Sequence, residues 1–282
     1  MIRGEADDNF NNQSVLSMNT LQGRFEINHD QTHAYQQNGY ALIKQLATPT
    51  EISNYRPLIL GAVKKLNPET RKMEDRDTYG KAFLQTMNLW EADAQVREFT
   101  LAKKFASVAA QLMGVERVRL YHDQALFKEP GGGFTPWHQD QFYWPLATKN
   151  TITMWMPLID ITTDMGMLTF AGGSHKDGLV KNLKISDESE TELDEHVAKN
   201  GYPVFMPDQM RAGDATFHAG LILHKAPGNS SRTMREVMTI IYYAEGTKVS
   251  EPINEWQEKD RQRWLEGLEV SEFAASKLNP LL

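Results

Sequence analysis

Hydrophobic residues in the first half of the chain recur at helical spacing. A helix is predicted over 48–66, where Thr48 can cap the first turn and Glu51 can complete a capping box. A second helical region is predicted over 88–113, since its apolar residues recur every three or four positions. A short strand is expected at 40–44.

The pattern changes from residue 115 onward, where short apolar runs alternate with polar positions and end at Gly, Pro or Asp. This alternation predicts a mainly β fold with flanking helices, of the jelly-roll or barrel type. The expected strand-bearing segments are 118–128, 151–160, 166–175, 213–226 and 235–245. A charged insertion at 181–200 is expected as an exposed helix or loop, its acidic run 187–195 as a solvated face, and 254–268 as an amphipathic helix.

Residues 1–30 are rich in Asn, Asp and Gln and hold few apolar anchors, so they are expected to form a flexible or loosely docked arm. The remaining residues, 31–282, are expected to form one domain with a helical N-terminal part and a C-terminal helix.

Composition excludes several classes of protein. The chain has no cysteine, which rules out disulfides, zinc fingers, iron–sulfur clusters and thiol nucleophiles. Its formal net charge of -7 and the lack of a basic face argue against nucleic-acid binding. No apolar run approaches the length of a membrane span and the N-terminus does not resemble a signal peptide, so a cytoplasmic protein is expected.

Candidate metal ligands lie at His138 and Asp140, two residues apart and flanked by aromatic residues. On a strand, such residues point to the same face and can converge on one metal ion. A third ligand can come from His218 or His224; these are six residues apart, so strand parity does not choose between them. His224 lies at the end of an apolar run and beside a turn, and this position favours it as the third ligand. Two histidines and one carboxylate form the facial triad of non-haem Fe(II) oxygenases.

An arginine follows the downstream histidine at a suitable distance. Arg235 comes eleven residues after His224, on the next expected strand. There its guanidinium can bind a carboxylate through two parallel hydrogen bonds. Arg232 is the rival candidate.

Together these motifs resemble the phytanoyl-CoA dioxygenase family, over roughly residues 32–250. The resemblance rests on Trp137-His138-Gln139-Asp140, on the K-x-PGGG run at 128–133, on GGSHK at 172–176 and on the stretch from 213 into Arg235. It implies a double-stranded β-helix (cupin-like) core, Fe(II) as metal and 2-oxoglutarate as co-substrate. The implied iron ligands are His138, Asp140 and His224, and the implied co-substrate contacts are Arg235, Gln124 and Trp155. Arg232 falls three residues short of the family spacing.

The activity implied by the resemblance is hydroxylation of a small molecule with O2, releasing succinate and CO2. Asp140 argues against a halogenase, which needs a small residue there. The alternative is a catalytically silent relative that binds a metal or ligand, and substrate-dependent succinate formation would distinguish the two. Ala226 departs from the hydroxyl residue of many relatives, which weakens the case for a second side-chain contact to the co-substrate. Since no basic cluster for the phosphates of an acyl-CoA can be placed, an uncharged or apolar metabolite is favoured. The oligomeric state is not predicted.

Two groups of residues allow more than one interpretation. Phe142, Tyr143 and Trp144 fit a substrate pocket and a hydrophobic core equally well. His122 and Asp123 are expected to form a buried, hydrogen-bonded pair.

Overall fold

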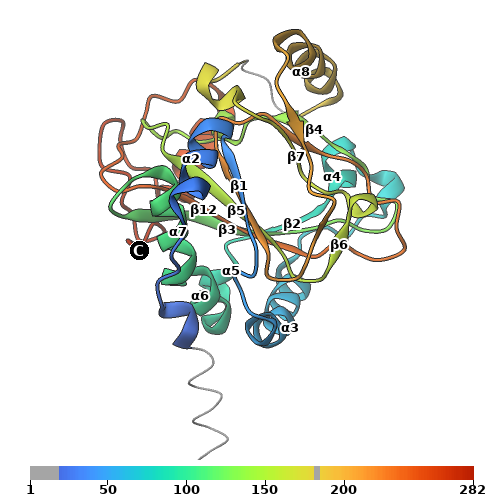
Figure 1. The fold of residues 1–282 in the computed structure, drawn as a ribbon, viewed down its shortest axis with the longest axis horizontal. Helices are drawn as coiled ribbons and strands as arrows, with labels where there is room; N and C mark the ends of the chain where they lie inside the picture. The colour runs from blue at the N-terminus through green and yellow to red at the C-terminus, as the bar shows by residue number, and fades with distance from the viewer. Residues whose placement is uncertain (1–18, 181–184) are drawn as a thin grey trace, which may run out of the picture.

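Two antiparallel sheets face each other in the computed structural model, which describes residues 19–180 and 185–282 (Figure 1). Most of the expected N-terminal arm, residues 1–18, and residues 181–184 of the charged insertion lie outside the described residues. The arm's last residues pack on α7 (Lys103–Met113), where Leu21 is buried and the Phe25 N–H donates to Ser107 Oγ. The expected jelly-roll core is confirmed.

The larger sheet has six strands in the order β1-β10-β5-β12-β3-β2. Its strands are β1 (Tyr40–Ile43), β2 (Leu84–Met87), β3 (Val118–Phe127), β5 (Thr151–Pro157), β10 (Ala215–Ala219) and β12 (Val237–Ala244). The second sheet has the order β4-β11-β7-β8, from β4 (Thr135–His138), β7 (Thr169–Ala171), β8 (Val204–Phe205) and β11 (His224–Ala226). A two-stranded sheet pairs β6 (Ile161–Thr162) with β9 (Gln209–Met210).

Helices cover one side of the six-stranded sheet (Figure 1). They are α2 (His29–Asn38), α3 (Pro49–Leu66), α5 (Leu89–Ala92), α6 (Ala94–Thr100) and α7. The capping box of α3 is confirmed, because the Thr48 hydroxyl accepts from Glu51 N–H and the Glu51 carboxylate accepts from Thr48 N–H. The second helical region forms three helices rather than one, since Asp93 ends α5 and caps α6, and Leu101 and Ala102 separate α6 from α7.

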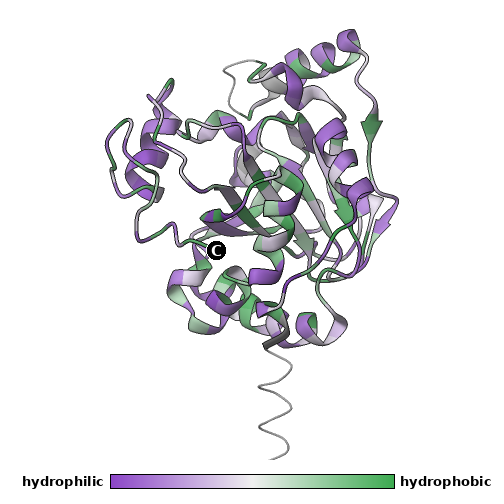
Figure 2. Ribbon diagram, turned by 60° about the vertical axis from the view of Figure 1, so that its left-hand side comes forward, coloured by the Kyte–Doolittle hydropathy of each residue, from purple (hydrophilic) through white to green (hydrophobic). Residues whose placement is uncertain are grey.

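The two faces of the six-stranded sheet have different partners. Met154 and Met156 of β5 point outward and join the helices in the main core, whereas Trp155 points inward and belongs to a second hydrophobic cluster together with Phe170 of the second sheet. Hydrophobic residues accordingly concentrate in the central strands (Figure 2). This alternation gives the inward face the side chains that can surround a small site.

The acidic helix α8 (Asp187–Asn200) packs on β4. Glu190 accepts a hydrogen bond from the Trp137 backbone N–H, Asp194 accepts one from the Trp137 indole, and Lys225 bridges both carboxylates. The expectation of a purely solvated acidic face is therefore wrong for Glu190 and Asp194, which hold the strand that ends at His138.

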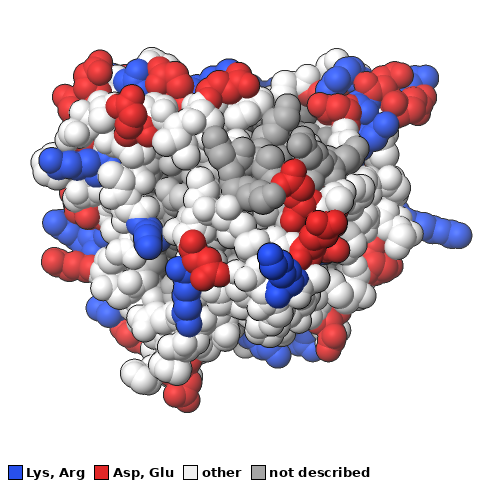
Figure 3. Space-filling model, turned by 90° about the horizontal axis from the view of Figure 1, so that it is seen from above, with Lys and Arg blue, Asp and Glu red and all other residues white. Residues whose placement is uncertain are grey.

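Basic and acidic side chains are interspersed on the face shown in Figure 3. Among the described residues, no helix is long and apolar enough to cross a membrane. The C-terminal helix is α9 (Glu255–Trp264), which contacts the turn after His138.

Candidate metal and co-substrate site

His138, Asp140 and His224 meet on the inward side of the second sheet. His138 ends β4, His224 begins β11, and the two residues are direct partners across the strands. Asp140 Oδ1 lies 3.6 Å from His138 Nε2 and 3.7 Å from His224 Nε2. All ligating atoms lie within 4.8 Å of one another. The expectation that one strand carries both His138 and Asp140 is wrong, because the chain leaves β4 after His138 and Asp140 begins the 3-10 turn η3 (Asp140–Tyr143).

Both imidazoles are oriented by backbone carbonyls. His138 Nδ1 lies 2.8 Å from Pro136 O, and His224 Nδ1 lies 3.1 Å from Ile222 O. A carbonyl oxygen can only accept, so each Nδ1 carries the proton and each Nε2 presents its lone pair to the centre of the group. Burial, followed by the neighbouring His138, holds the pKa of His224 well below its usual value, which keeps its imidazole neutral, as a metal ligand must be.

The second carboxylate oxygen of Asp140 has its own partners. Thr153 Oγ1 donates to Asp140 Oδ2 at 3.0 Å, and His218 Nε2 lies 3.4 Å from the same oxygen. Burial alone would raise the pKa of Asp140, but the surrounding imidazoles lower it well below its usual range. Two imidazoles and one carboxylate fit a divalent iron ion with open coordination positions.

His218 differs from His224 in its hydrogen bonding. Its Nδ1 has no partner within 19–180 and 185–282, so no backbone carbonyl orients its ring. Its Nε2 faces the Asp140 oxygen that points away from the other two imidazoles. This geometry favours His224 over His218 as the third ligand.

Arg235 is a buried cation without an anion beside it. Its side chain is 2% exposed, its Nη1 donates to Gly166 O, and its Nε has no hydrogen-bond partner in the described part of the chain. No carboxylate of that part pairs with it. Burial lowers the pKa of the guanidinium to about 9, so it is still charged at neutral pH. Since an unpaired buried charge is costly, the arrangement fits an anionic ligand that completes the site.

Trp155 lies with Arg235, and Gln124 lies in the same row of the six-stranded sheet, on the other side of Thr239. The guanidinium sits over the Trp155 ring, 5.3 Å from its centre. Gln124 of β3 accepts a hydrogen bond from the Gln85 side chain, and its contact with the co-substrate stays a prediction. Arg232, the rival arginine, is exposed on the loop before β12.

The aromatic residues after Asp140 have separate roles. Trp144 is buried in a hydrophobic cluster with Tyr121 and Ile241. Tyr143 is half-buried, faces Trp256 of α9, and its hydroxyl accepts from a backbone N–H at residue 185. The core interpretation therefore holds for Trp144.

Sequence reasoning missed Thr153 and Lys128 as parts of this region. Thr153 shares the inward face of β5 with Trp155, so strand parity could have identified it. Lys128 was noted only as the first residue of the K-x-PGGG run, and its burial beside Arg235 has no local sequence signal.

Comparison with known proteins places the chain in a family. The family model for phytanoyl-CoA dioxygenase (PhyH) matches residues 35–237. A phytanoyl-CoA dioxygenase of Arabidopsis thaliana is 30% identical over 153 residues, which cover 54% of this chain and 53% of that protein. A methylphosphonate hydroxylase of Gimesia maris is 26% identical over 219 residues, covering 76% of this chain and 80% of that protein.

Solved structures share the fold. The epimerase SnoN of nogalamycin biosynthesis, solved in complex with Fe3+, alpha ketoglutarate and nogalamycin RO, aligns with a TM-score of 0.74 at 20% identity, over 89% of this chain and 97% of that chain. The chain spans about half the length of the Arabidopsis relative. The family model nevertheless covers most of the chain, and the motifs that carried the resemblance lie within it. The chain therefore belongs to the phytanoyl-CoA dioxygenase family.

Proposed function

We propose that this protein is an Fe(II)- and 2-oxoglutarate-dependent dioxygenase that hydroxylates a small molecule and releases succinate and CO2. One observation carries the proposal: a triad of His138, Asp140 and His224 lies in the same barrel as Arg235, a buried guanidinium with an unused donor and no anionic partner among the described residues. A metal centre and a receptor for a carboxylate are the two halves of a 2-oxoglutarate site.

The residues of the site have three roles: they hold the metal and the co-substrate, orient the metal ligands, and exclude water. His138, Asp140 and His224 would hold the iron, which when bound supplies activation of O2. Arg235 would bind the far carboxylate of 2-oxoglutarate, and the Trp155 ring restricts the guanidinium to one plane. Thr153 fixes the rotation of the Asp140 carboxylate. The two ligand histidines are almost fully buried, which excludes water from the metal side that faces the sheet.

Relatives support the class of reaction and leave the substrate open. SnoN was solved with iron and alpha ketoglutarate, and the Gimesia relative is named a hydroxylase. Their substrates differ widely, so the substrate of this chain is expected to be set by residues outside the triad and Arg235.

The test is release of succinate from 2-oxoglutarate by the Fe(II)-loaded protein in air, across a panel of acyl-CoA esters, phosphonates, compatible solutes and polyketide-like compounds. The proposal expects at least one compound to stimulate succinate release, and Asp140→Ala to abolish the stimulation. Stimulation that persists at the full rate in Asp140→Ala would contradict it. A wild-type protein that binds 2-oxoglutarate but is stimulated by no compound in the panel would favour the catalytically silent alternative.

A further inference from the structure

Lys128 and Arg235 are direct partners across two antiparallel segments. The Lys128 N–H donates to Arg235 O and the Arg235 N–H donates to Lys128 O, each at 2.9 Å. Residues opposed in this way carry their side chains on the same face, and like charges placed there destabilise the sheet. Lys128 is fully buried at 0% exposure and Arg235 is 2% exposed. The fold therefore holds two basic side chains next to each other, away from water.

Gly132 of the K-x-PGGG run and Gly166 make room for the lysine. A Cβ at Gly132 would lie 3.0 Å from Lys128 Cγ, and one at Gly166 would lie 2.9 Å from Lys128 Cδ. Lys128 Nζ donates to Gly133 O, and Arg235 Nη1 donates to Gly166 O. Both basic side chains thus reach the segment around Gly166. The ammonium has three donors, so the single bond to Gly133 leaves donors for a ligand.

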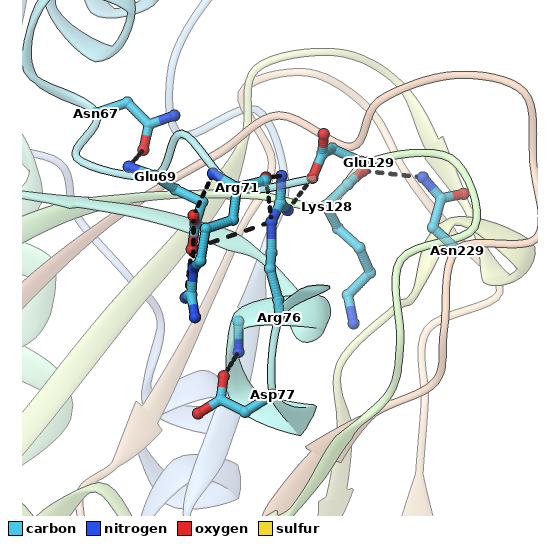
Figure 4. Close-up of polar contacts among 9 residues, drawn as sticks. Asn67, Glu69, Arg71, Arg76, Asp77, Lys128, Glu129 and Asn229 are labelled. Atoms are coloured by element: carbon cyan, nitrogen blue, oxygen red, sulfur yellow. Dashed lines mark hydrogen bonds and ion pairs between the residues drawn. The ribbon is translucent and has the colours of Figure 1, made fainter. Parts of the chain in front are cut away.

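No protein carboxylate neutralises Lys128 within the described chain. The charged residues on the surrounding segments are Arg76, Lys81, Glu129, Asp164, Arg232 and Arg235. Glu129 pairs with Arg76, and Figure 4 shows the Lys128 side chain running away from that pair. Asp164 accepts from the Thr162 hydroxyl, and Lys81 contributes its backbone carbonyl to Gly133 N–H.

These surroundings change the protonation of the amine. Burial, and then the charge of Arg235, lowers the pKa of Lys128 to about 6. In the free protein at neutral pH the amine is therefore mostly neutral. An anion bound between the two side chains would raise the pKa of Lys128 again, because it supplies the opposite charge that the protein lacks.

We propose that Lys128 is the second cation of the co-substrate site and takes up one proton when the 2-oxoglutarate dianion binds. This inference rests on the proposed function of Arg235. The proton comes from solvent and converts the neutral amine to an ammonium beside the far carboxylate. Affinity for 2-oxoglutarate should consequently fall as pH rises above about 6, by up to about tenfold per pH unit.

Calorimetry measures the proton directly. The Fe(II) protein is titrated with 2-oxoglutarate without oxygen at pH 7.5, in phosphate and in Tris, whose ionisation enthalpies differ. The wild type should take up about one proton per bound dianion and Lys128→Met close to none. Lys149→Met, which removes an exposed lysine, should match the wild type. Lys128→Arg offers a second variant, since its permanent charge should allow binding without proton uptake.

The outcomes separate this inference from the proposed function. Binding of 2-oxoglutarate to the wild type without proton uptake would overturn the role of Lys128 and leave the proposed function standing. Proton uptake that persists in both Lys128→Met and Lys128→Arg would likewise overturn the role of Lys128 and leave the proposed function standing. A wild-type Fe(II) protein that fails to bind 2-oxoglutarate at all would overturn both.

Discussion

Replacing Thr153 with valine tests whether the carboxylate of Asp140 is positioned by its neighbour. Valine has nearly the same shape as threonine but cannot donate to Asp140 Oδ2, where the present hydrogen bond is 3.0 Å long. A hydrogen bond to a charged group contributes about 1.5–3 kcal/mol, which corresponds to about 10- to 100-fold in affinity. The Asp140 side chain is 20% exposed, so water can replace part of the lost bond. We therefore expect Thr153→Val to weaken Fe(II) binding by about tenfold.

The assay is competition for Fe(II) with a coloured chelator under anaerobic conditions, with thermal unfolding as a check on folding. Thr151→Val is the matched control. Thr151 lies two residues away on β5, is buried, and donates to the Gln141 side chain rather than to Asp140. The control should lose some stability and keep its iron affinity. Equal iron affinities for Thr153→Val and the wild type would refute the positioning role.

Three further changes test other parts of the site. His224→Ala should lose Fe(II) binding and His218→Ala should keep it in a metal-binding assay; the reverse result would move the ligand role to His218. Arg235→Ala should weaken 2-oxoglutarate by roughly 30-fold or more, since removing one partner of a buried charge pair costs about 2–5 kcal/mol, and Arg235→Lys should recover only part. Without co-substrate, Lys128→Met should unfold at a higher temperature than the wild type. The folded pKa of Lys128, about 6, lies below the ordinary 10.5, so unfolding takes up a proton between these values. The loss of stability that buried Lys128 causes in the wild type therefore shrinks as pH rises from about 6 to 10.5. A difference in unfolding temperature between Lys128→Met and the wild type that does not change with pH would contradict the burial of an unpaired amine.

Local signals predicted the parts of the fold that depend on neighbours in sequence. The start of α3 followed from Thr48 and Glu51, which cap each other three residues apart. The alternating runs after residue 115 predicted short strands and hence a jelly roll, because one buried face per strand requires a second sheet to cover it.

Features that depend on the path of the chain between segments were not predictable in this way. The alternation of side chains along a strand could not decide whether His218 or His224 is the third ligand, since that argument assumed one continuous strand. The chain instead leaves β10 at Ala219, turns, and enters the other sheet at His224. Both histidines still reach Asp140, from different sheets.

His122 and Asp123 are both buried, as expected, but their side chains do not pair with each other. Adjacent residues of a strand point to opposite faces. Asp123 faces the helices, where it accepts from the backbone N–H groups of Leu89 and Trp90 and from the Thr100 hydroxyl. His122 packs against Trp264 of the C-terminal helix.

The most direct test of the central claim is the visible absorption of the anaerobic Fe(II) protein as 2-oxoglutarate is added. A keto acid chelated to Fe(II) gives a charge-transfer band, which requires the iron and the co-substrate in one site. The wild type should develop this band and saturate at one 2-oxoglutarate per chain, and Asp140→Ala should not develop it. A wild-type protein without the band, or an Asp140→Ala variant with the same band, would contradict the account.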